Sequence, residues 1–71
     1  MKVGARNKLV AEVMEIKRGT VMCQVKVGLK RGPGLMMSSV MTLDSLDELG
    51  IQVGDEVEVV VKAVNVLLMK P

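Results

Sequence analysis

Aromatic residues and histidine are absent from this 71-residue chain, and cysteine occurs once. Single-stranded nucleic acids are usually held by stacking their bases on aromatic side chains, so the absence of Phe, Tyr and Trp argues against nucleic-acid binding. Without histidine, and with a single cysteine, the sequence offers no nucleophile–base pair and no cluster of direct cation ligands. We therefore predict a protein that is not an enzyme and has no directly ligated metal cation.

Long hydrophobic runs are also missing. No segment reaches the roughly 18 apolar residues that a membrane-spanning helix needs, and the N-terminus lacks the apolar core of a signal peptide. The single cysteine, Cys23, cannot form an internal disulfide and lies in an alternating segment, which favours a buried apolar role over a reactive thiol. These features predict a soluble cytoplasmic protein.

What the chain does contain is an excess of aliphatic surface. Hydrophobic residues make up 49% of the sequence, seven of them methionines, and the net charge is only +2. A chain of this length forms one small domain, residues 1–71, and such a domain buries only about 60% of the surface that its unfolded form exposes. The remaining apolar surface predicts contacts with further copies of the chain.

Alternation of polar and apolar residues predicts three strands, at residues 9–16, 20–29 and 35–42. The turn at 17–19 joins the first two, and the KRGPG cluster at 30–34 joins the last two, because glycine and proline favour tight turns. The methionines of the third strand indicate core or interface packing rather than a metal site.

The hydrophobic period changes at residues 44–49, DSLDEL, where leucines stand three residues apart and Gly50 occupies the position of a helix C-cap. This segment predicts one short helix. Its carboxylates, Asp44, Asp47 and Glu48, are better explained as helix caps and dipole partners than as an acid–base pair.

Two further strands are predicted after the helix, at residues 56–63 and 65–69. Five strands with one short helix between the third and the fourth is the element order of an OB-type barrel. We therefore predict an all-β fold, an OB-like five-stranded barrel.

Several polar groups are suited to binding an anion. Arg6 carries a permanently charged fork of donors and Lys62 is an isolated ammonium in a valine-rich run, while Thr42 and Ser45 place hydroxyls at the helix start. The small residues Gly4 and Ala5 let backbone amides approach a bound oxygen. A tetrahedral oxyanion is a ligand that these groups fit together.

Each of these residues also has a simpler structural explanation. Arg6 pairs with a neighbouring carboxylate in that alternative, Thr42 and Ser45 only cap the helix, and Lys62 extends from a strand into water. Residue spacing alone leaves the two interpretations open.

Three segments of the chain resemble a known family when they are taken in order. They are GARNKL at 4–9, SSVMTLDSLDELGI at 38–51 and GDEVEVVVKAVNVLLM at 54–69. In this order they resemble the small molybdenum-pterin-binding proteins, called molbindins or Mop proteins, whose domain type is shared with the TOBE domains of some oxyanion transporters. The resemblance runs nearly from end to end of the chain.

The resemblance implies an OB-like fold, a hexamer built as a trimer of dimers, and molybdate or tungstate bound between subunits. It implies no reaction and no organic cofactor, and it favours storage or buffering of the free oxyanion in the cell. By residue, it implies oxyanion contacts at the following positions: Gly4, Ala5, Arg6, Thr42, Ser45, Lys62 and Ala63.

One position departs from the family pattern. Gly4 stands where the family usually has serine, so one hydroxyl donor is missing, which predicts weaker binding or an altered anion preference. The segment at 30–37, KRGPGLMM, is also unlike the family, and no second class of site is placed there. Two alternatives remain, a structural assembly module with a degenerate anion site and an OB-type nucleic-acid binder.

Overall fold

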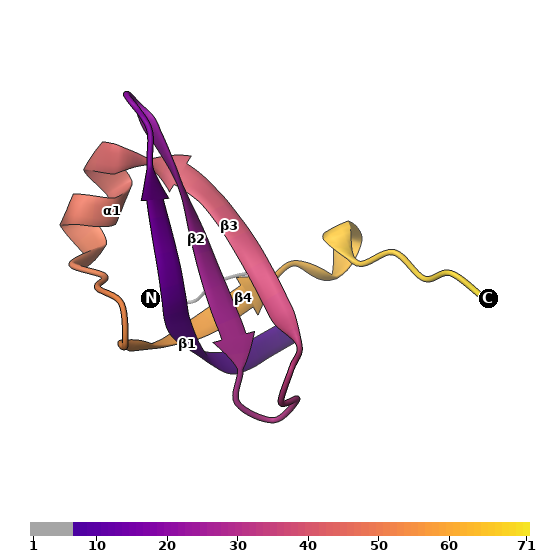
Figure 1. Cartoon of the computed structure of the whole chain (residues 1–71). Helices are drawn as coiled ribbons and strands as arrows, with labels where there is room; N and C mark the ends of the chain where they lie inside the picture. Colours follow the sequence, from indigo (N-terminus) through magenta and orange to yellow (C-terminus); the bar gives the residue numbers. More distant parts are fainter. Residues whose placement is uncertain (1–6) are drawn as a thin grey trace.

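The computed structural model describes residues 7–71. Four strands form one antiparallel sheet in the order β3-β2-β1-β4, and this sheet is curled into a half-barrel (Figure 1). A short helix, α1, follows β3, and a single turn of 3-10 helix, η1, follows β4. The elements are β1 (Asn7–Arg18), β2 (Met22–Leu29), β3 (Met36–Thr42), α1 (Leu43–Leu49), β4 (Glu56–Val61) and η1 (Ala63–Asn65).

The curl depends on β1, which pairs with two neighbours at once. Residues 7–12 of β1 pair with β4, and residues 11–18 pair with β2. The register with β2 shifts between Val13 and Glu15, which leaves Met14 as the extra residue of a bulge. A bulge bends its strand and increases the local twist, so the two halves of β1 point in different directions and carry their partners around the same core.

The core lies on the inner face of this curled sheet. Successive residues of a strand point to opposite faces, so only every second side chain of β1 and β2 is buried. One further side chain comes from α1 and covers one end of the half-barrel. The buried residues are Ala11, Val13, Cys23, Val25, Val27 and Leu46. The expected apolar role of the cysteine is therefore confirmed.

The predicted helix and the turn at 30–34 are confirmed, whereas the connection between β1 and β2 lies at residues 19–21 rather than 17–19, because β1 extends to Arg18. Gly50 has the left-handed φ of 67° that ends α1, and its N–H is shared between the carbonyls of Leu46 and Asp47. In the turn between β2 and β3, the N–H of Leu35 donates to the carbonyl of Gly32 at 2.8 Å, and Gly34 has φ 88°. A positive φ one residue after Pro33 is the pattern of a type II turn.

The predicted fifth strand at 65–69 is wrong for the single chain. After β4, which ends at Val61 rather than at residue 63, the backbone forms η1 and then continues without pairing to any strand in the described part of the chain. Leu67 and Leu68 are 91% and 95% exposed. Apolar residues favour a strand only where a neighbouring backbone supplies hydrogen bonds, and this segment has no such neighbour within residues 7–71.

No helix within residues 7–71 is long and apolar enough to cross a membrane.

Replacing Leu46 tests how α1 is held on the sheet. Leu46 is 1% exposed, so Leu46→Ala leaves a cavity under the helix and lowers the free energy of unfolding by about 2–5 kcal/mol. The control Glu48→Ala, on the exposed side of the same helix, changes it by less than about 0.5 kcal/mol. Urea denaturation at one fixed protein concentration measures both, and equal effects would contradict this packing.

Candidate functional site

Thr42 and Ser45 are held together at the start of α1. Thr42 is the N-cap, with φ −72° and ψ 155°, and its Oγ1 accepts a hydrogen bond from the backbone N–H of Ser45 at 3.1 Å. The Thr42 hydroxyl donates to Oγ of Ser45 at 2.9 Å. The capping role is therefore real. It still leaves the Ser45 hydroxyl hydrogen free to donate outward, because Oγ of Ser45 is the acceptor in this pair.

Lys62 and Ala63 lie where β4 gives way to η1. Lys62 has extended backbone angles, φ −69° and ψ 140°, and its side chain makes no capping hydrogen bond. Both residues are exposed. Lys62 is therefore placed after the end of the strand rather than inside it, with its ammonium in water.

The two halves of the predicted site lie at opposite ends of the subunit. Lys62 directly follows Val61, which pairs with Asn7 at the beginning of β1. Thr42 pairs with Met22, at the end of the sheet where β1 finishes. The twelve residues of β1 separate these ends, and a strand rises about 3.3 Å per residue. A single subunit therefore does not bring the hydroxyls and the ammonium to one ligand.

Gly4, Ala5 and Arg6 lie outside the described residues. In the sequence they immediately precede Asn7, whose partner Val61 is followed by Lys62. The sequence placed all seven positions in one site between subunits, without saying which subunit supplies which residue, and the structure adds that the α1 end and the β4 end of one subunit lie apart. The signal was available in the predicted element order, because three successive antiparallel pairings make β3 and β4 run in opposite directions.

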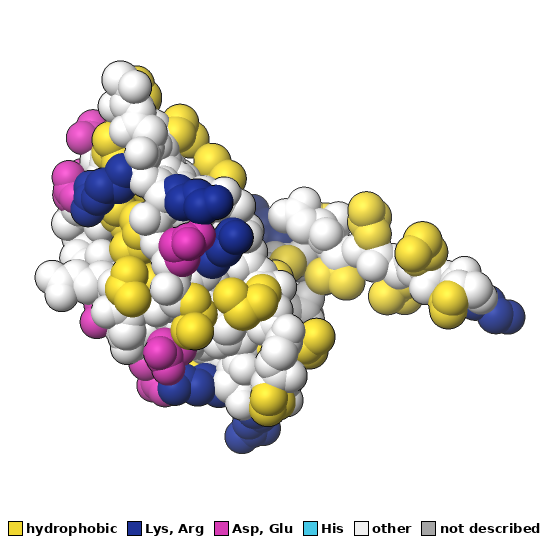
Figure 2. All heavy atoms as spheres, viewed as in Figure 1, with side chains coloured by type: hydrophobic (Ala, Val, Ile, Leu, Met, Phe, Trp, Pro, Cys, Tyr) yellow, Lys and Arg dark blue, Asp and Glu magenta, His cyan; other side chains and the backbone are white. Residues whose placement is uncertain are grey.

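Most lysine and arginine side chains on the sheet are engaged with carboxylates. Within residues 7–71 the ion pairs are exposed, with nitrogen–oxygen distances of 3.3–3.8 Å, and such pairs contribute at most about 1 kcal/mol each. Figure 2 shows these mixed charges on the surface of the half-barrel. The pairs are Lys8–Glu58, Lys17–Glu15, Arg18–Asp47, Lys26–Glu15 and Lys30–Glu12. Lys62 is in none of them.

The acidic residues of α1 follow the helix-capping interpretation. Asp44 lies in the first turn, where a negative charge is favourable, and Asp47 pairs with Arg18 at 3.7 Å. Residues 7–71 contain no group of three His, Cys, Asp or Glu side chains arranged to hold a metal ion. Besides the Thr42–Ser45 and Lys62–Ala63 groups, residues 7–71 form an apolar hollow between β3 and β4.

The chain is a small oligonucleotide/oligosaccharide-binding-like (OB-like) half-barrel, with an ammonium group at one end and hydroxyl groups at the other. This fold is the one shared by the small TOBE domains. The TOBE domain family model matches residues 4–68. Molybdenum-pterin-binding protein 2 of Clostridium pasteurianum is 36% identical over 69 residues, which cover 97% of this chain and 98% of that protein. The chain belongs to the molbindin, or Mop, family of TOBE-domain proteins.

Solved structures agree with this assignment. A molybdate-binding protein from Sporomusa ovata superposes with a TM-score of 0.88 at 38% identity, covering 99% of this chain and 100% of that one. The cytoplasmic molybdate-binding protein ModG, solved with molybdate bound, gives a TM-score of 0.77 at 40% identity over 89% of this chain and 43% of its own. The predicted OB-like fold is confirmed, with four strands rather than five in residues 7–71.

Replacing Thr42 tests how much its cap hydrogen bond stabilises α1. Thr42→Ala removes the acceptor of the Ser45 N–H and lowers the free energy of unfolding by about 1 kcal/mol, whereas Thr42→Ser keeps the acceptor and most of that stability. Thr20→Ala, in the exposed turn between β1 and β2, serves as the control. Urea denaturation compares the three variants, and a Thr42→Ala variant as stable as Thr20→Ala would contradict the cap.

Proposed function

We propose that this protein binds molybdate or tungstate between subunits of a homo-oligomer and thereby stores or buffers the oxyanion inside the cell. The observation that carries the proposal is the nearly full-length likeness, at 36–40% identity, to proteins whose names state molybdenum or molybdate binding. The location follows the ModG relative, which is described as cytoplasmic. No reaction is part of the proposal.

The chemistry of the carried-over residues suits an intact oxyanion. Arg6 and Lys62 offset the two negative charges of the anion, and charge-assisted hydrogen bonds of this kind are among the strongest in proteins. The Ser45 hydroxyl and the backbone amides of Ala5 and Ala63 direct further donors at its oxygens. These groups are hydrogen-bond donors and cations, so they recognise the oxygen atoms and not the metal itself. The free oxyanion, without an organic pterin cofactor, is the proposed ligand.

The separation of the site's two halves supports an intersubunit location. Thr42 and Ser45 lie at one end of the fold, and Lys62 and Ala63 lie at the other. Two copies are needed before hydroxyls and ammonium meet on one anion. We propose the trimer-of-dimers hexamer that the family resemblance implies, because it repeats such boundaries within a closed assembly.

A second candidate function is a structural assembly module whose anion site has decayed. The observation that favours it is Gly4, which replaces the hydroxyl donor of the family serine. The two candidates share a fold and an oligomer and differ only in anion binding. Arg6 is the residue that distinguishes them, because removing its charge matters only if an anion is bound.

Calorimetric titration with molybdate, tungstate and sulfate tests the proposed function. We expect heat of binding with molybdate or tungstate and affinity losses of roughly ten- to a hundredfold for Arg6→Ala and Lys62→Ala, as for the loss of one charged hydrogen-bond partner. Lys26→Ala, which removes a lysine already paired with Glu15, is the control and keeps the wild-type affinity. An intact oligomer that binds neither metal oxyanion would favour the assembly module.

Restoring the family's serine tests the meaning of Gly4. Gly4→Ser adds one hydroxyl donor toward a charged ligand, which is worth about 1.5–3 kcal/mol, and raises molybdate affinity by roughly ten- to a hundredfold. The same titration measures it. The control Gly4→Ala adds a Cβ without a hydroxyl, so an equal gain with alanine would show that hydrogen bonding is not the cause.

A further inference from the structure

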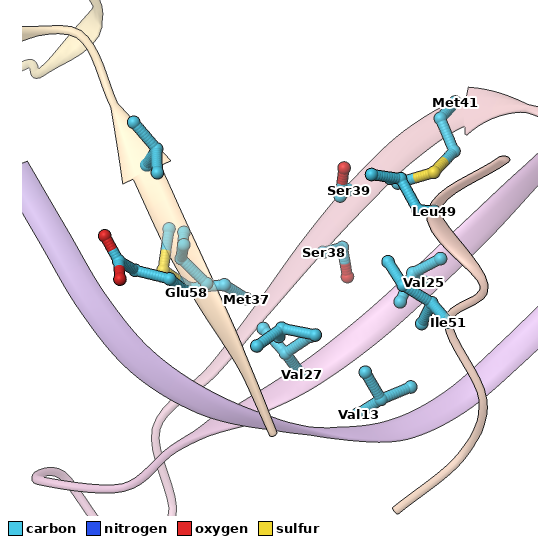
Figure 3. Close-up of a pocket in the computed structure, with 13 residues that line it drawn as sticks. Val13, Val25, Val27, Met37, Ser38, Ser39, Met41, Leu49, Ile51 and Glu58 are labelled. Carbon is cyan, nitrogen blue, oxygen red and sulfur yellow. The ribbon is translucent and has the colours of Figure 1, made fainter. Parts of the chain in front are cut away.

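A second hollow lies where β1 extends past the end of β2. It has a volume of about 420 Å³ and is separate from the hollow between β3 and β4 (Figure 3). The pairing of β1 with β2 begins at Ala11, opposite Leu29, so residues 8–10 of β1 continue beyond it. There the chain turns into the loop at residues 30–35, which joins β2 to β3 (Figure 1). We call the space between residues 8–10 and this loop the loop hollow.

Backbone hydrogen bonds hold both walls of the loop hollow in place. The N–H of Lys30 donates to the carbonyl of Val10 at 3.0 Å, which ties the loop to β1. The N–H of Leu29 donates to the carbonyl of Leu35 at 3.0 Å and closes the loop at its base. A Cβ at Gly32 would lie 2.6 Å from Cδ1 of Leu35, so the absence of a side chain there lets Leu35 pack on the loop backbone. The loop hollow is therefore a formed part of the fold.

The lining of the loop hollow is mainly aliphatic. Leu9 and Val10 of β1 are 41% and 47% exposed, and Leu35 of the loop is 59% exposed. Leu29, at the end of β2, is half-buried between them. Small-molecule sites are typically hollows of about 300–1,000 Å³ with an apolar lining and a few polar groups. The volume and lining of the loop hollow fit one small organic molecule.

The charged groups of the loop hollow are all cationic. Lys8 and Arg31 line it, and none of the described lining residues is acidic. Arg31 is in no ion pair within residues 7–71, whereas the neighbouring Lys30 pairs with Glu12 at 3.3 Å. Lys8 lies 3.8 Å from Glu58, but both side chains are more than half exposed, so this pair is weak. The loop hollow therefore favours a negatively charged ligand.

We propose that the loop hollow binds a small amphipathic organic anion. Its aromatic or aliphatic body covers the leucine and valine side chains, and its carboxylate, sulfonate or phosphate group accepts hydrogen bonds from Arg31 and Lys8. A guanidinium offers paired donors to such oxygens. An inorganic anion would leave the apolar lining exposed, and a neutral hydrocarbon would leave the cations without a partner. The inference goes beyond the proposed function, because it uses none of the residues assigned to molybdate.

Fluorescence titration with anilinonaphthalene sulfonate tests the two chemical requirements together. This probe carries one sulfonate on an aromatic body, and N-phenylnaphthylamine is its uncharged analogue. We expect saturable binding of one sulfonate probe per chain, about tenfold tighter than binding of the analogue. Equal affinity for both probes, or no saturable binding, would overturn the proposal. Displacement of the probe by an equal concentration of molybdate or sulfate would overturn the apolar part of it.

Variants of the exposed loop identify the residues that hold the probe. Arg31→Ala weakens binding by about tenfold, and Arg31→Lys keeps most of the affinity because it keeps the charge. Leu35→Ser removes an apolar wall and weakens binding by about three- to tenfold. The control Lys26→Ala removes a lysine that pairs with Glu15 outside the hollow and keeps the wild-type affinity. An Arg31→Ala variant with wild-type affinity would refute the site.

Failure of this inference is distinguishable from failure of the proposed function. Lys62→Ala, which is expected to weaken molybdate binding, keeps the affinity for the probe, because Lys62 does not line the loop hollow. A protein that binds the probe at the loop hollow but no molybdate would leave this inference standing.

Nuclear magnetic resonance of the ¹⁵N-labelled protein locates the probe. We expect the amide signals of Leu29, Gly32 and Leu35 to shift on titration, while that of Gly50, at the end of α1, stays in place. Shifts confined to the hollow between β3 and β4 would overturn the assignment. Vesicles of equal parts phosphatidylcholine and phosphatidylglycerol test a lipid surface as the source of the anion. We expect the protein to stay in the supernatant, and co-sedimentation that Arg31→Ala abolishes would overturn the small-molecule ligand.

Discussion

The bend in β1 is the constraint on which the rest of this structure depends. Because the bulge at Met14 turns the strand, one half of β1 pairs with β4 and the other half with β2, and a single sheet curls around one core. The curl puts Ala11 and Val13 at the centre of that core, where neither is exposed. It also keeps β3 and β4 from meeting, so the half-barrel has an open side.

The open side explains why so much of the apolar surface of this small domain stays exposed. Within residues 7–71, six side chains are buried, while many large hydrophobic residues stay exposed on the strands and the tail. A domain this small gains little from its own core, and further burial must come from contact with other chains. The apolar hollow between β3 and β4 and the exposed C-terminal tail are two surfaces of this kind.

The same antiparallel arrangement governs the proposed binding site. Strand directions place the Thr42–Ser45 cap and the Lys62–Ala63 connection at opposite ends of one subunit. An anion that needs a hydroxyl donor and a cation at once must then lie between copies. Assembly and ligand binding are linked in this proposal, because the hydroxyl donor and the ammonium come from different copies.

The sequence by itself determined the local elements. Alternation predicted β1 to β4, the leucine spacing with Gly50 predicted α1, and the turn at Pro33–Gly34 followed from backbone preferences, since each depends on neighbouring residues alone. The ordered motifs also identified the family. The predicted fifth strand at 65–69 was wrong, because strand pairing needs a distant backbone that local pattern does not specify. Only the tertiary structure decided the bend at Met14, the open edge between β3 and β4 and the separation of Ser45 from Lys62. These features depend on strand direction and register, which are set by contacts between residues far apart in the sequence.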